Sequence, residues 1–347
     1  MKHPEGVLPI LLTAPGGISI LIKHLFPSFS SEKFFEAYRD GKPVAFTENL
    51  EELILDELAT FDDCPGKDVV SEKFSIMKTA LSTKYRLFVS DSLFSVVLST
   101  PRFLLSDACY VGIPYNALYQ TVDDVAKDCH RLKFASPDPL WRRLWSRLWG
   151  ELNATQASKI EWGSELGVKL MESLVLSKEE KRFLVQRAIQ EADASNLLLY
   201  EAISVVLPLS IAGAVNYGIG KFSEIKYRFY ARKPVLWPIY VSTVILGLYA
   251  TDFTRRFARF YIDTASDKLT AQIGAKYSKA GIDFYTKSME RNRYINGLLK
   301  KANLARMYDE DGDFLPHRFL NKPNTSLKHR LKVVEAIAEG QEEANKL

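Results

Sequence analysis

The sequence predicts a mainly helical α+β fold that carries a transmembrane helical hairpin, and three observations lead to this prediction. The chain has 347 residues, enough for about two domains of ordinary size. Its 47% apolar and 25% charged residues exclude a chain that is disordered throughout. Its mean hydropathy of −0.10 excludes a channel built mostly of membrane helices but leaves room for about two or three spans.

Apolar runs and charge divide the chain into four segments. We expect an N-terminal apolar segment at 1–27, a soluble α+β domain at 28–196, a transmembrane hairpin at 197–253, and a C-terminal helical region at 254–347 that packs with the soluble domain. Residues 253–347 carry 18 Lys and Arg against 12 Asp and Glu. Because the basic residues flank apolar runs and form no stripe with interleaved aromatics, they indicate membrane orientation and no nucleic-acid partner.

The N-terminal segment contains the apolar run Val7–Ile22, whose 16 residues are interrupted by two prolines and two glycines. A helix that crosses a bilayer needs about 20 apolar residues, so a third span and a segment that does not span both stay open. Before this run the basic residues are Lys2 and His3, with the acidic Glu5 beside them, and no small-residue cleavage motif follows the run. The run therefore does not resemble a cleaved secretory signal.

Residues Ser30–Asp62 predict two amphipathic helices separated by Gly41–Pro43. Ser30 or Ser31 would cap the first helix, and Thr47 would cap the second. The inner side of the first helix would carry its aromatic residues, which are Phe34, Phe35 and Tyr38.

The middle of the soluble domain predicts strands followed by a helix. From Phe74 to Tyr119, β-branched and aromatic residues alternate with Ser and Thr, which indicates short strands in YRLFVSD, FSVVLST and ACYVGIP. Ser177–Ala192 predicts a helix with a capping box, because Glu180 follows Ser177 by three positions. Its inner side would carry Phe183, Leu184 and Ile189.

The stretch Asp138–Gly150 predicts a basic amphipathic helix, with Trp141, Trp145 and Trp149 spaced four residues apart. Indole and guanidinium side chains suit a membrane surface, whereas a tryptophan row also suits packing on the protein's own core. Both interpretations stay open, and the three tryptophans are candidate partner contacts.

Two long apolar runs form the predicted hairpin, with spans at about 197–217 and 234–252. Ala202–Gly220 contains 19 residues without a charge, and Pro234–Thr251 contains 18. At 1.5 Å per residue, a helix formed by either run would be nearly as long as a hydrocarbon core is thick, which is about 30 Å. The linker KFSEIKYRFYARK carries five cations, which favours the more negative, matrix-like or cytoplasmic side. A buried soluble helix is the alternative for the first run.

Helical composition continues beyond the hairpin. Arg255–Leu299 is strongly helical in composition, and Gly281 within it marks either a turn or a close helix contact. A polar helix follows at Lys328–Lys346.

Several strings resemble binding motifs only in part. Gly218–Ser223 lacks one glycine and the correctly placed hydroxyl of a phosphate loop. Asp309–Asp313 has the first acids of a calcium loop but not its turn glycine or closing glutamate, which predicts a solvated turn. The three cysteines and five histidines show no metal-site or disulfide spacing. We therefore expect no catalytic, cofactor-binding or metal-binding residues.

One order of elements resembles the layout of membrane-bound zincin peptidases, in which a helix precedes a membrane hairpin and acidic residues follow it. In that class two histidines one turn apart hold zinc, and the glutamate after the first histidine activates water. Here Arg187 and Glu191 occupy the histidine positions, Ala188 occupies the glutamate position, and Asp263 and Asp267 lie downstream. A guanidinium cannot ligate zinc and alanine cannot accept a proton, so this layout would belong to an inactive enzyme.

Six strings carry a resemblance to one family: HLFP at 24–27, VGIP at 111–114, Glu161–Phe183, Asp267–Lys287, NGLLK at 296–300 and Met307–Phe319. In this order they resemble the transmembrane protein 177 family, and AGIDFYTK at 280–287 is the most distinctive of them. Relative to the family pattern, Gln120–Ala157 looks like an insertion, and it contains the tryptophan-rich helix.

The resemblance implies a non-enzymatic, multi-pass protein of the mitochondrial inner membrane. It implies a factor that stabilises the chaperone of newly made cytochrome c oxidase subunit 2 and supports maturation of that subunit at the copper-site stage. The expected partners are therefore subunit 2, its membrane chaperone and the lipid bilayer. The alternative is a membrane-bound peptidase-like protein, active or degenerate, in membrane-protein quality control. A small carrier or channel is disfavoured, because spans with one internal charge offer few groups to line a path.

Three residues of the first apolar run are further candidates for partner contacts. Glu201 lies near one end of the run, where it would either meet a polar partner or reach out to the membrane interface. Gly213 and Gly218 would let another helix approach closely.

Overall fold

The structure is a computed structural model of the full chain. It describes residues 37–39, 42–61, 85–90, 98–100, 109–129, 161–193, 233–301, 308–315 and 325–344, together with 210, 213–215 and 217. At some of these positions, among them 233–241, it describes the backbone only.

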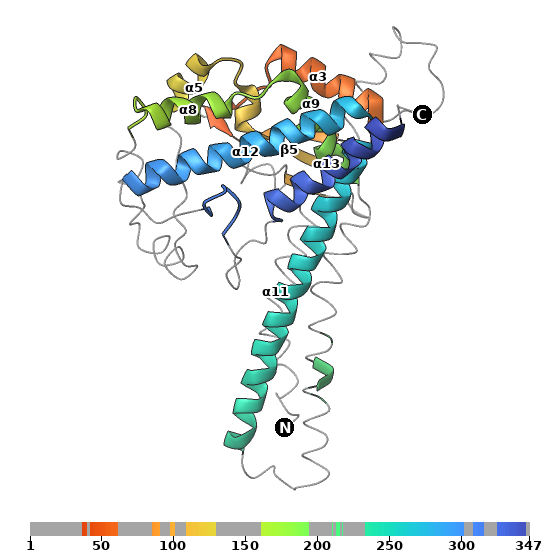
Figure 1. Ribbon diagram of the computed structural model, residues 1–347. Coiled ribbons are helices and arrows are strands. Elements are labelled where there is room, and N and C mark those ends of the chain that lie inside the picture. The colour runs from red at the N-terminus through yellow and green to blue at the C-terminus, as the bar shows by residue number, and fades with distance from the viewer. Residues whose placement is uncertain are drawn as a thin grey trace.

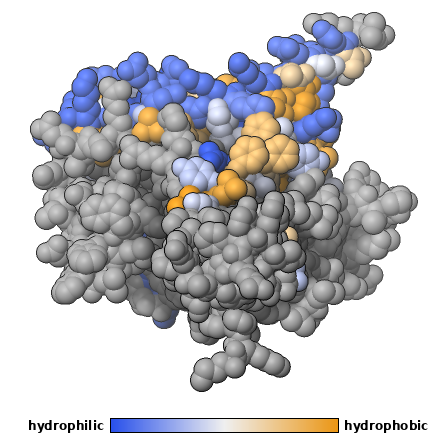
Figure 2. All heavy atoms as spheres, turned by 90° about the horizontal axis from the view of Figure 1, so that it is seen from below, coloured by the Kyte–Doolittle hydropathy of each residue, from blue (hydrophilic) through white to orange (hydrophobic). Residues whose placement is uncertain are grey.

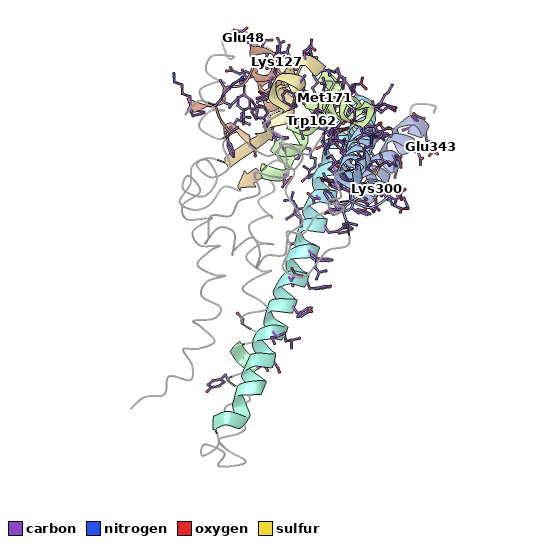
Figure 3. All side chains as sticks on the ribbon, turned by 90° about the vertical axis from the view of Figure 1, so that its left-hand side faces the viewer. Glu48, Lys127, Trp162, Met171, Lys300 and Glu343 are labelled. Atoms are coloured by element: carbon purple, nitrogen blue, oxygen red, sulfur yellow. The ribbon has the colours of Figure 1, made fainter. Side chains whose placement is uncertain are left out.

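In the described part of the chain, six helices gather into one folded body, and a seventh projects from it (Figure 1). The helices of the body are α3 (Glu48–Phe61), α5 (Val122–Asp128), α8 (Glu165–Leu174), α9 (Lys178–Asp193), α12 (Ala275–Lys301) and α13 (Leu327–Ala344). Helix α11 (Lys233–Gln272) joins the body with its C-terminal part, whereas its N-terminal part extends away (Figure 1). The described helical residues 213–215 lie beside this projecting part in both Figure 1 and Figure 3.

A small mixed sheet lies in the body. Strand β5 (Cys109–Pro114) is central, with β3 (Tyr85–Ser90) parallel on one side and β4 (Leu98–Thr100) antiparallel on the other. The side chains of Val111 and Ile113 are buried. These three strands confirm the strand predictions, and a 3₁₀ turn, η3 (Tyr115–Leu118), follows β5.

The prediction for the start of the soluble domain was wrong at Tyr38. Instead of lying on the inner side of a helix, Tyr38 belongs to β1 (Tyr38–Arg39), which pairs antiparallel with β2 (Lys42–Pro43). The neighbouring Ala37 N–H donates to the Val89 carbonyl at 2.8 Å, so the backbone here bonds to β3. This partner is distant in the sequence, and no local pattern predicts it. The predicted helix at 30–36 lies outside the described residues.

Two helices begin at the predicted caps, and a third begins one residue before its predicted start. Helix α3 begins after Thr47, whose carbonyl accepts from Leu50 N at 2.9 Å. Helix α9 has the predicted capping box, since Glu180 N donates to Ser177 Oγ at 3.1 Å and Ser177 N donates to a Glu180 carboxylate oxygen at 2.6 Å. Helix α13 begins one residue before the predicted start, at Leu327.

The helical prediction for 255–299 is confirmed, with a break between α11 and α12. Gly281 lies inside α12 and marks a close contact, not a turn. A Cβ there would come within 2.7 Å of the Phe183 ring on α9. The glycine therefore lets α12 lie close to α9.

The acidic turn at 309–313 is a bonded corner, which corrects the prediction of a solvated turn. The side chain of Asp313 is 5% exposed, and its Oδ1 accepts from Leu327 N at 2.7 Å. Asn292 and Asn296 of α12 hold the corner by donating to the carbonyls of Gly312 and Tyr308, each at 2.8 Å. The local acidic pattern indicated solvent, whereas the bonding partners come from α12 and α13.

Three apolar clusters fill the body, and α9 and α12 connect them. One lies between α3, α9 and β5, the second between α8 and α12, and the third between α9, α12 and α13. Phe183, Leu184 and Ile189 are buried, as predicted for the inner side of α9. Helix α9 thus lies in the middle of the body, where it contacts the sheet, α3, α11 and α12.

Within the described residues, none of the helices combines the length and apolar composition needed to cross a membrane. The predicted second span, 234–252, lies in α11. Most of the predicted first span lies outside the described residues, as do the apolar segment 7–22 and residues 130–157 of the insertion. The hairpin and the four-segment division stay predictions.

Candidate functional site: a buried arginine–carboxylate cluster

Six charged side chains meet in the centre of the body, and we call them the arginine–carboxylate cluster. Helix α9 supplies two of them, α11 supplies three and α13 supplies one. The members are Arg187, Glu191, Arg259, Asp263, Asp267 and Arg330. The cluster holds three guanidinium groups and three carboxylates, so its formal charges balance.

Arg187 on α9 joins the cluster to both acids of α11. Its Nε donates to Asp267 Oδ1 at 2.7 Å, and one terminal nitrogen donates to Asp263 Oδ1 at 2.8 Å. The same nitrogen lies 3.3 Å from Glu191 one turn along α9. All four side chains are at most 2% exposed. A residue that sequence patterns place on a helix face therefore acts as the central cation of the core.

Arg330 on α13 also holds Asp267. Its Nε donates to Asp267 Oδ2 at 2.6 Å and a terminal nitrogen donates to Asp267 Oδ1 at 2.7 Å, which is a bidentate pair. The hydroxyl of Tyr285 on α12 donates to Asp267 Oδ1 at 2.6 Å. Asp267, with 0% exposure, thus ties four helices together.

The outer part of the cluster is formed by Arg259 of α11. It contacts Glu191 at 2.7 Å and Asp263 at 3.0 Å, and its side chain is 20% exposed. The second oxygen of Asp263 accepts from the hydroxyl of Thr325 at 2.7 Å, just before α13. Each acid of the cluster is therefore bonded to more than one basic or hydroxyl group.

These contacts keep the side chains charged although they are buried. Burial alone would raise the pKa of Asp263, but the guanidinium groups of Arg259, Arg330 and Arg187 hold the pKa below its usual value. Burial would lower the pKa of Arg330, and the neighbouring Asp267 holds that pKa well above its usual value. At neutral pH neither Asp263 nor Arg330 is therefore poised to exchange a proton.

The cluster offers neither a metal site nor a general base of the peptidase kind. Guanidinium groups occupy the lone pairs that a metal would need, and Ala188 provides no proton acceptor beside Arg187. In the described part of the chain, no three His, Cys, Asp or Glu side chains are placed to share a metal ion.

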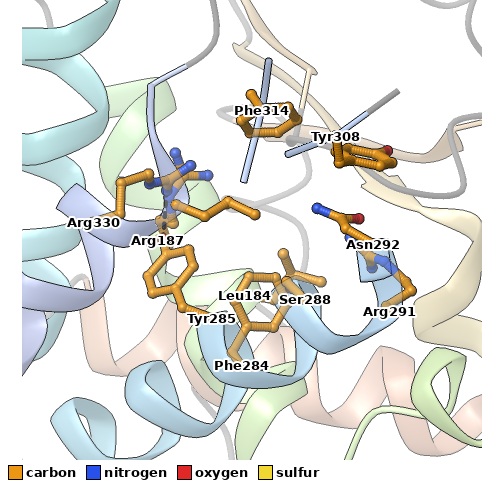
Figure 4. Close-up of a pocket in the computed structure, with 11 residues that line it drawn as sticks. Leu184, Arg187, Phe284, Tyr285, Ser288, Arg291, Asn292, Tyr308, Phe314 and Arg330 are labelled. Atoms are coloured by element: carbon orange, nitrogen blue, oxygen red, sulfur yellow. Dashed lines mark hydrogen bonds between the residues drawn. The ribbon is translucent and has the colours of Figure 1, made fainter. Parts of the chain in front are cut away.

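A small cavity of about 40 Å³ borders the cluster (Figure 4). Arg187 and Arg330 converge beside Tyr285 at one end, and Asn292 and Tyr308 line the other (Figure 4). Among the described residues, Asn292 Oδ1 is buried without a hydrogen-bond partner. Since a water needs about 10–15 Å³, the cavity has room for a few waters but not for a peptide.

Of the candidate partner contacts predicted from the sequence, the structure describes Gly213, which is not a member of the cluster. Gly213 is described as helical, and a Cβ built there would meet open space within 4 Å. The other candidates lie outside the described residues, and they are Trp141, Trp145, Trp149, Glu201 and Gly218. Their roles stay predictions.

Two of the six cluster members, Arg259 and Arg330, and the bonded Tyr285 were not predicted from the sequence. Arg187, Glu191 and the two aspartates were singled out only through the zincin-like spacing. Arg259 had an available signal, because it lies one turn before Asp263 on the same helix. For Arg330 and Tyr285 no such signal exists, since each reaches Asp267 only through the tertiary fold.

Comparison with known proteins identifies one family. The model of the family described as transmembrane protein 177 matches residues 34–322. Transmembrane protein 177 of Danio rerio is 25% identical over 319 residues, which cover 90% of this chain and 87% of that protein. The Xenopus laevis protein is 22% identical over 89% of this chain and 86% of its own. The Homo sapiens protein is 24% identical over 45% of this chain and 49% of its own. No solved structure gives a significant match.

Proposed function

The chain belongs to the transmembrane protein 177 family, and we propose that it is a non-enzymatic assembly factor anchored in the mitochondrial inner membrane. In this proposal it binds the membrane chaperone of newly made cytochrome c oxidase subunit 2 and keeps that chaperone stable. Maturation of subunit 2 at the copper-site stage depends on the chaperone. The protein itself carries no copper.

The shape of the molecule supports the anchoring part of the proposal. The projecting part of α11 contains the charge-free run 234–251, and helical residues 213–215 lie beside it (Figure 1). In this arrangement two spans would leave the folded body on the same side. A body held at the membrane by a hairpin can present its surface to another membrane protein.

The observation that carries the non-enzymatic part is the bonding within the arginine–carboxylate cluster. A peptidase needs an acid that is free to accept a proton and a metal or nucleophile beside a cleft. Here three carboxylates are bonded to three guanidinium groups in the core, and the cavity beside them holds about 40 Å³. This arrangement favours a role in stability over a role in bond cleavage.

A specific observation keeps the peptidase-like protein as the second candidate. Arg187 and Glu191 of α9 meet Asp263 and Asp267 of α11, at the places where the zincin layout would gather its metal ligands. On this alternative the chain descends from a membrane peptidase and has exchanged its metal for ion pairs. Active proteolysis would require a metal or a nucleophile with a base.

Deletion of the gene in cultured cells tests the assembly role. We expect the steady-state level of the subunit 2 chaperone to fall and subunit 2 maturation to slow, with both restored by the full chain. Turnover of unrelated inner-membrane proteins should not change. Unchanged chaperone after deletion would reject the proposal.

Metal analysis of the purified full chain separates the assembly role from an active peptidase. The assembly role predicts less than stoichiometric zinc and no cleavage of membrane-protein substrates by the detergent-solubilised protein. One zinc per chain, together with cleavage that a chelator abolishes, would favour the peptidase instead.

A further inference from the structure

Helix α11 carries a row of exposed apolar side chains along one face. The row contains Ile245, Leu246, Tyr249, Phe253, Phe257 and Phe260, which are between 44% and 68% exposed. Steps of three and four residues place them on the same side of the helix. Figure 3 shows side chains extending outward along this helix below the body.

The opposite face of α11 is fixed against the body. Asp252, Ala258 and Ile262 are at most 6% exposed. Further along α11, inside the body, Asp263 and Asp267 are held by the arginine–carboxylate cluster. The rotation of the helix is therefore set by the core, and the apolar row must face outward.

Three members of the row lie beyond the predicted end of the second span at residue 252. At 1.5 Å per residue, Phe253 lies about 2 Å, Phe257 about 8 Å and Phe260 about 12 Å past that point. The headgroup layer on each side of a hydrocarbon core is about 5–8 Å thick. Phe253 and Phe257 therefore fall within the headgroup layer, whereas Phe260 lies beyond its outer edge.

Basic groups stand at the same height. The Arg256 side chain is 39% exposed and pairs with Asp252 at 2.7 Å, one turn before it on the helix. An arginine stem covers apolar surface while its guanidinium stays in a polar layer, and aromatic rings favour the same layer. Phe260 also stacks on His329 of α13, with ring centroids 4.6 Å apart. The row is thus connected to the body through α13.

Bulky side chains argue for lipid and against a second protein helix as the occupant of this face. Helices that pair in membranes use small residues that let backbones approach closely. The glycine in this part of α11, Gly247, lies on the buried side. In the view from below, described apolar side chains are visible at several places among polar and grey atoms, most of them above and to the right of the centre (Figure 2).

We propose that Phe253 and Phe257, with Arg256 beside them, form an interfacial seat in the headgroup layer of a phospholipid bilayer. The seat fixes the height and the orientation of the folded body above the membrane. Phe260 and His329 transmit this position to α13. The inference rests on the proposed membrane anchor and adds a second, shallower contact with lipid.

Photo-crosslinking in the full chain tests the seat. Benzoylphenylalanine replaces one residue at a time at Leu246, Phe253, Phe257 or Leu269. Each protein is reconstituted in vesicles of phosphatidylcholine and phosphatidylethanolamine that contain a clickable phosphatidylcholine. Leu269 is the matched control, because it is 49% exposed on the same helix but lies about 25 Å beyond residue 252.

We expect lipid adducts at Leu246, Phe253 and Phe257 and several-fold fewer at Leu269. Adducts at Leu246 without adducts at Phe253 and Phe257, or protein adducts in their place, would overturn the seat and leave the anchor standing. Absence of lipid adducts at Leu246 would overturn the anchor and the seat together. Far-UV circular dichroism of each variant confirms that it is folded before the comparison is made.

Discussion

Arg187 and Asp267 lie 80 positions apart in the sequence and share a hydrogen bond of 2.7 Å, with 2% and 0% of their side chains exposed. This pair joins α9 to α11 on the two sides of the predicted hairpin. Because the helices before and after the predicted spans meet through it, the pair joins the two ends of the predicted hairpin to the folded body.

Substitution of Arg187 by Met should lower the free energy of unfolding by about 3–5 kcal/mol, because it leaves Asp263 and Asp267 charged in the core with one cation fewer. Chemical denaturation of the detergent-solubilised full chain measures the loss. The control is Lys169→Met, which breaks the exposed pair with Glu165 at 2.6 Å on α8. That pair is exposed to solvent and should contribute far less to the free energy of unfolding than the buried one. Equal losses in the two variants would contradict a stabilising role for the cluster.

The buried carboxyl group of Glu57 on α3 predicts that the stability of the folded state depends on pH. Its side chain is 0% exposed and accepts from the Tyr277 hydroxyl at 2.7 Å. Burial raises the pKa of Glu57 above its ordinary value of 4.5, although Tyr277 and Arg182 act against the rise. The folded state therefore binds this proton more tightly than the unfolded state does. The stabilising contribution is complete below pH 4.5 and is lost as the pH rises through the folded pKa.

Glutamine at position 57 has no carboxyl group to ionise, so the Glu57→Gln variant should not lose stability as the pH rises. Its amide oxygen can still accept from Tyr277. We expect the variant to be at least as stable as the wild type at neutral pH, and the difference to vanish near pH 4.5. Denaturant titrations at the two pH values measure it, and Glu52→Gln on the exposed side of the same helix is the control. A large loss of stability at neutral pH would show instead that the ion pair with Arg182 dominates.

Gly312 should tolerate no side chain. Its φ of 83° is in the left-handed region, and a Cβ would lie 2.0 Å from the Met289 carbonyl oxygen. Gly312→Ala should therefore lower the free energy of unfolding by more than about 2 kcal/mol. Gly340 in α13 has open space around a Cβ, so Gly340→Ala should raise stability by about 0.5–1 kcal/mol. We expect the melting temperature of Gly312→Ala to lie below that of Gly340→Ala, and the reverse order would contradict the prediction.

Asp313 should act as a cap for α13. Its carboxylate accepts from Ser326 Oγ at 2.5 Å and from Leu327 N at 2.7 Å. Removal of the carboxylate in Asp313→Ala should lower the free energy of unfolding by about 2 kcal/mol, which is the upper end for a helix cap. It should also increase amide hydrogen exchange in the first turn of α13. Asp311→Ala, on the exposed side of the same corner, serves for comparison. Unchanged exchange in α13 would mean that the corner and the helix are independent.

Features that depend on neighbours in the sequence could be predicted from the sequence. The capping box of Ser177 and Glu180, the strand at Cys109–Pro114 and the inward face of α9 all follow from local spacing. Features that depend on distant partners could not. Tyr38 lies in a strand because the neighbouring backbone bonds to Val89, and the acidic corner is buried because α12 and α13 close around it.

The candidate site shows the same division. The turn-long spacings of Arg187 with Glu191 and of Asp263 with Asp267 were visible in the sequence and indicated two matching helix faces. The contribution of Arg330 from α13, which balances the charge, was not visible in the sequence. Its nearest cluster partner, Asp267, lies 63 positions away. A pattern that indicated an empty metal site is, in the structure, a set of ion pairs.

The most direct test of the account is affinity capture of the full chain from detergent-solubilised mitochondrial inner membranes, with the subunit 2 chaperone quantified in the eluate. We expect the chaperone to be captured with the wild-type chain at levels well above those obtained with an unrelated two-span protein of the same membrane. Capture of the chaperone no better than with that unrelated protein would contradict the central claim that this chain holds an assembly partner.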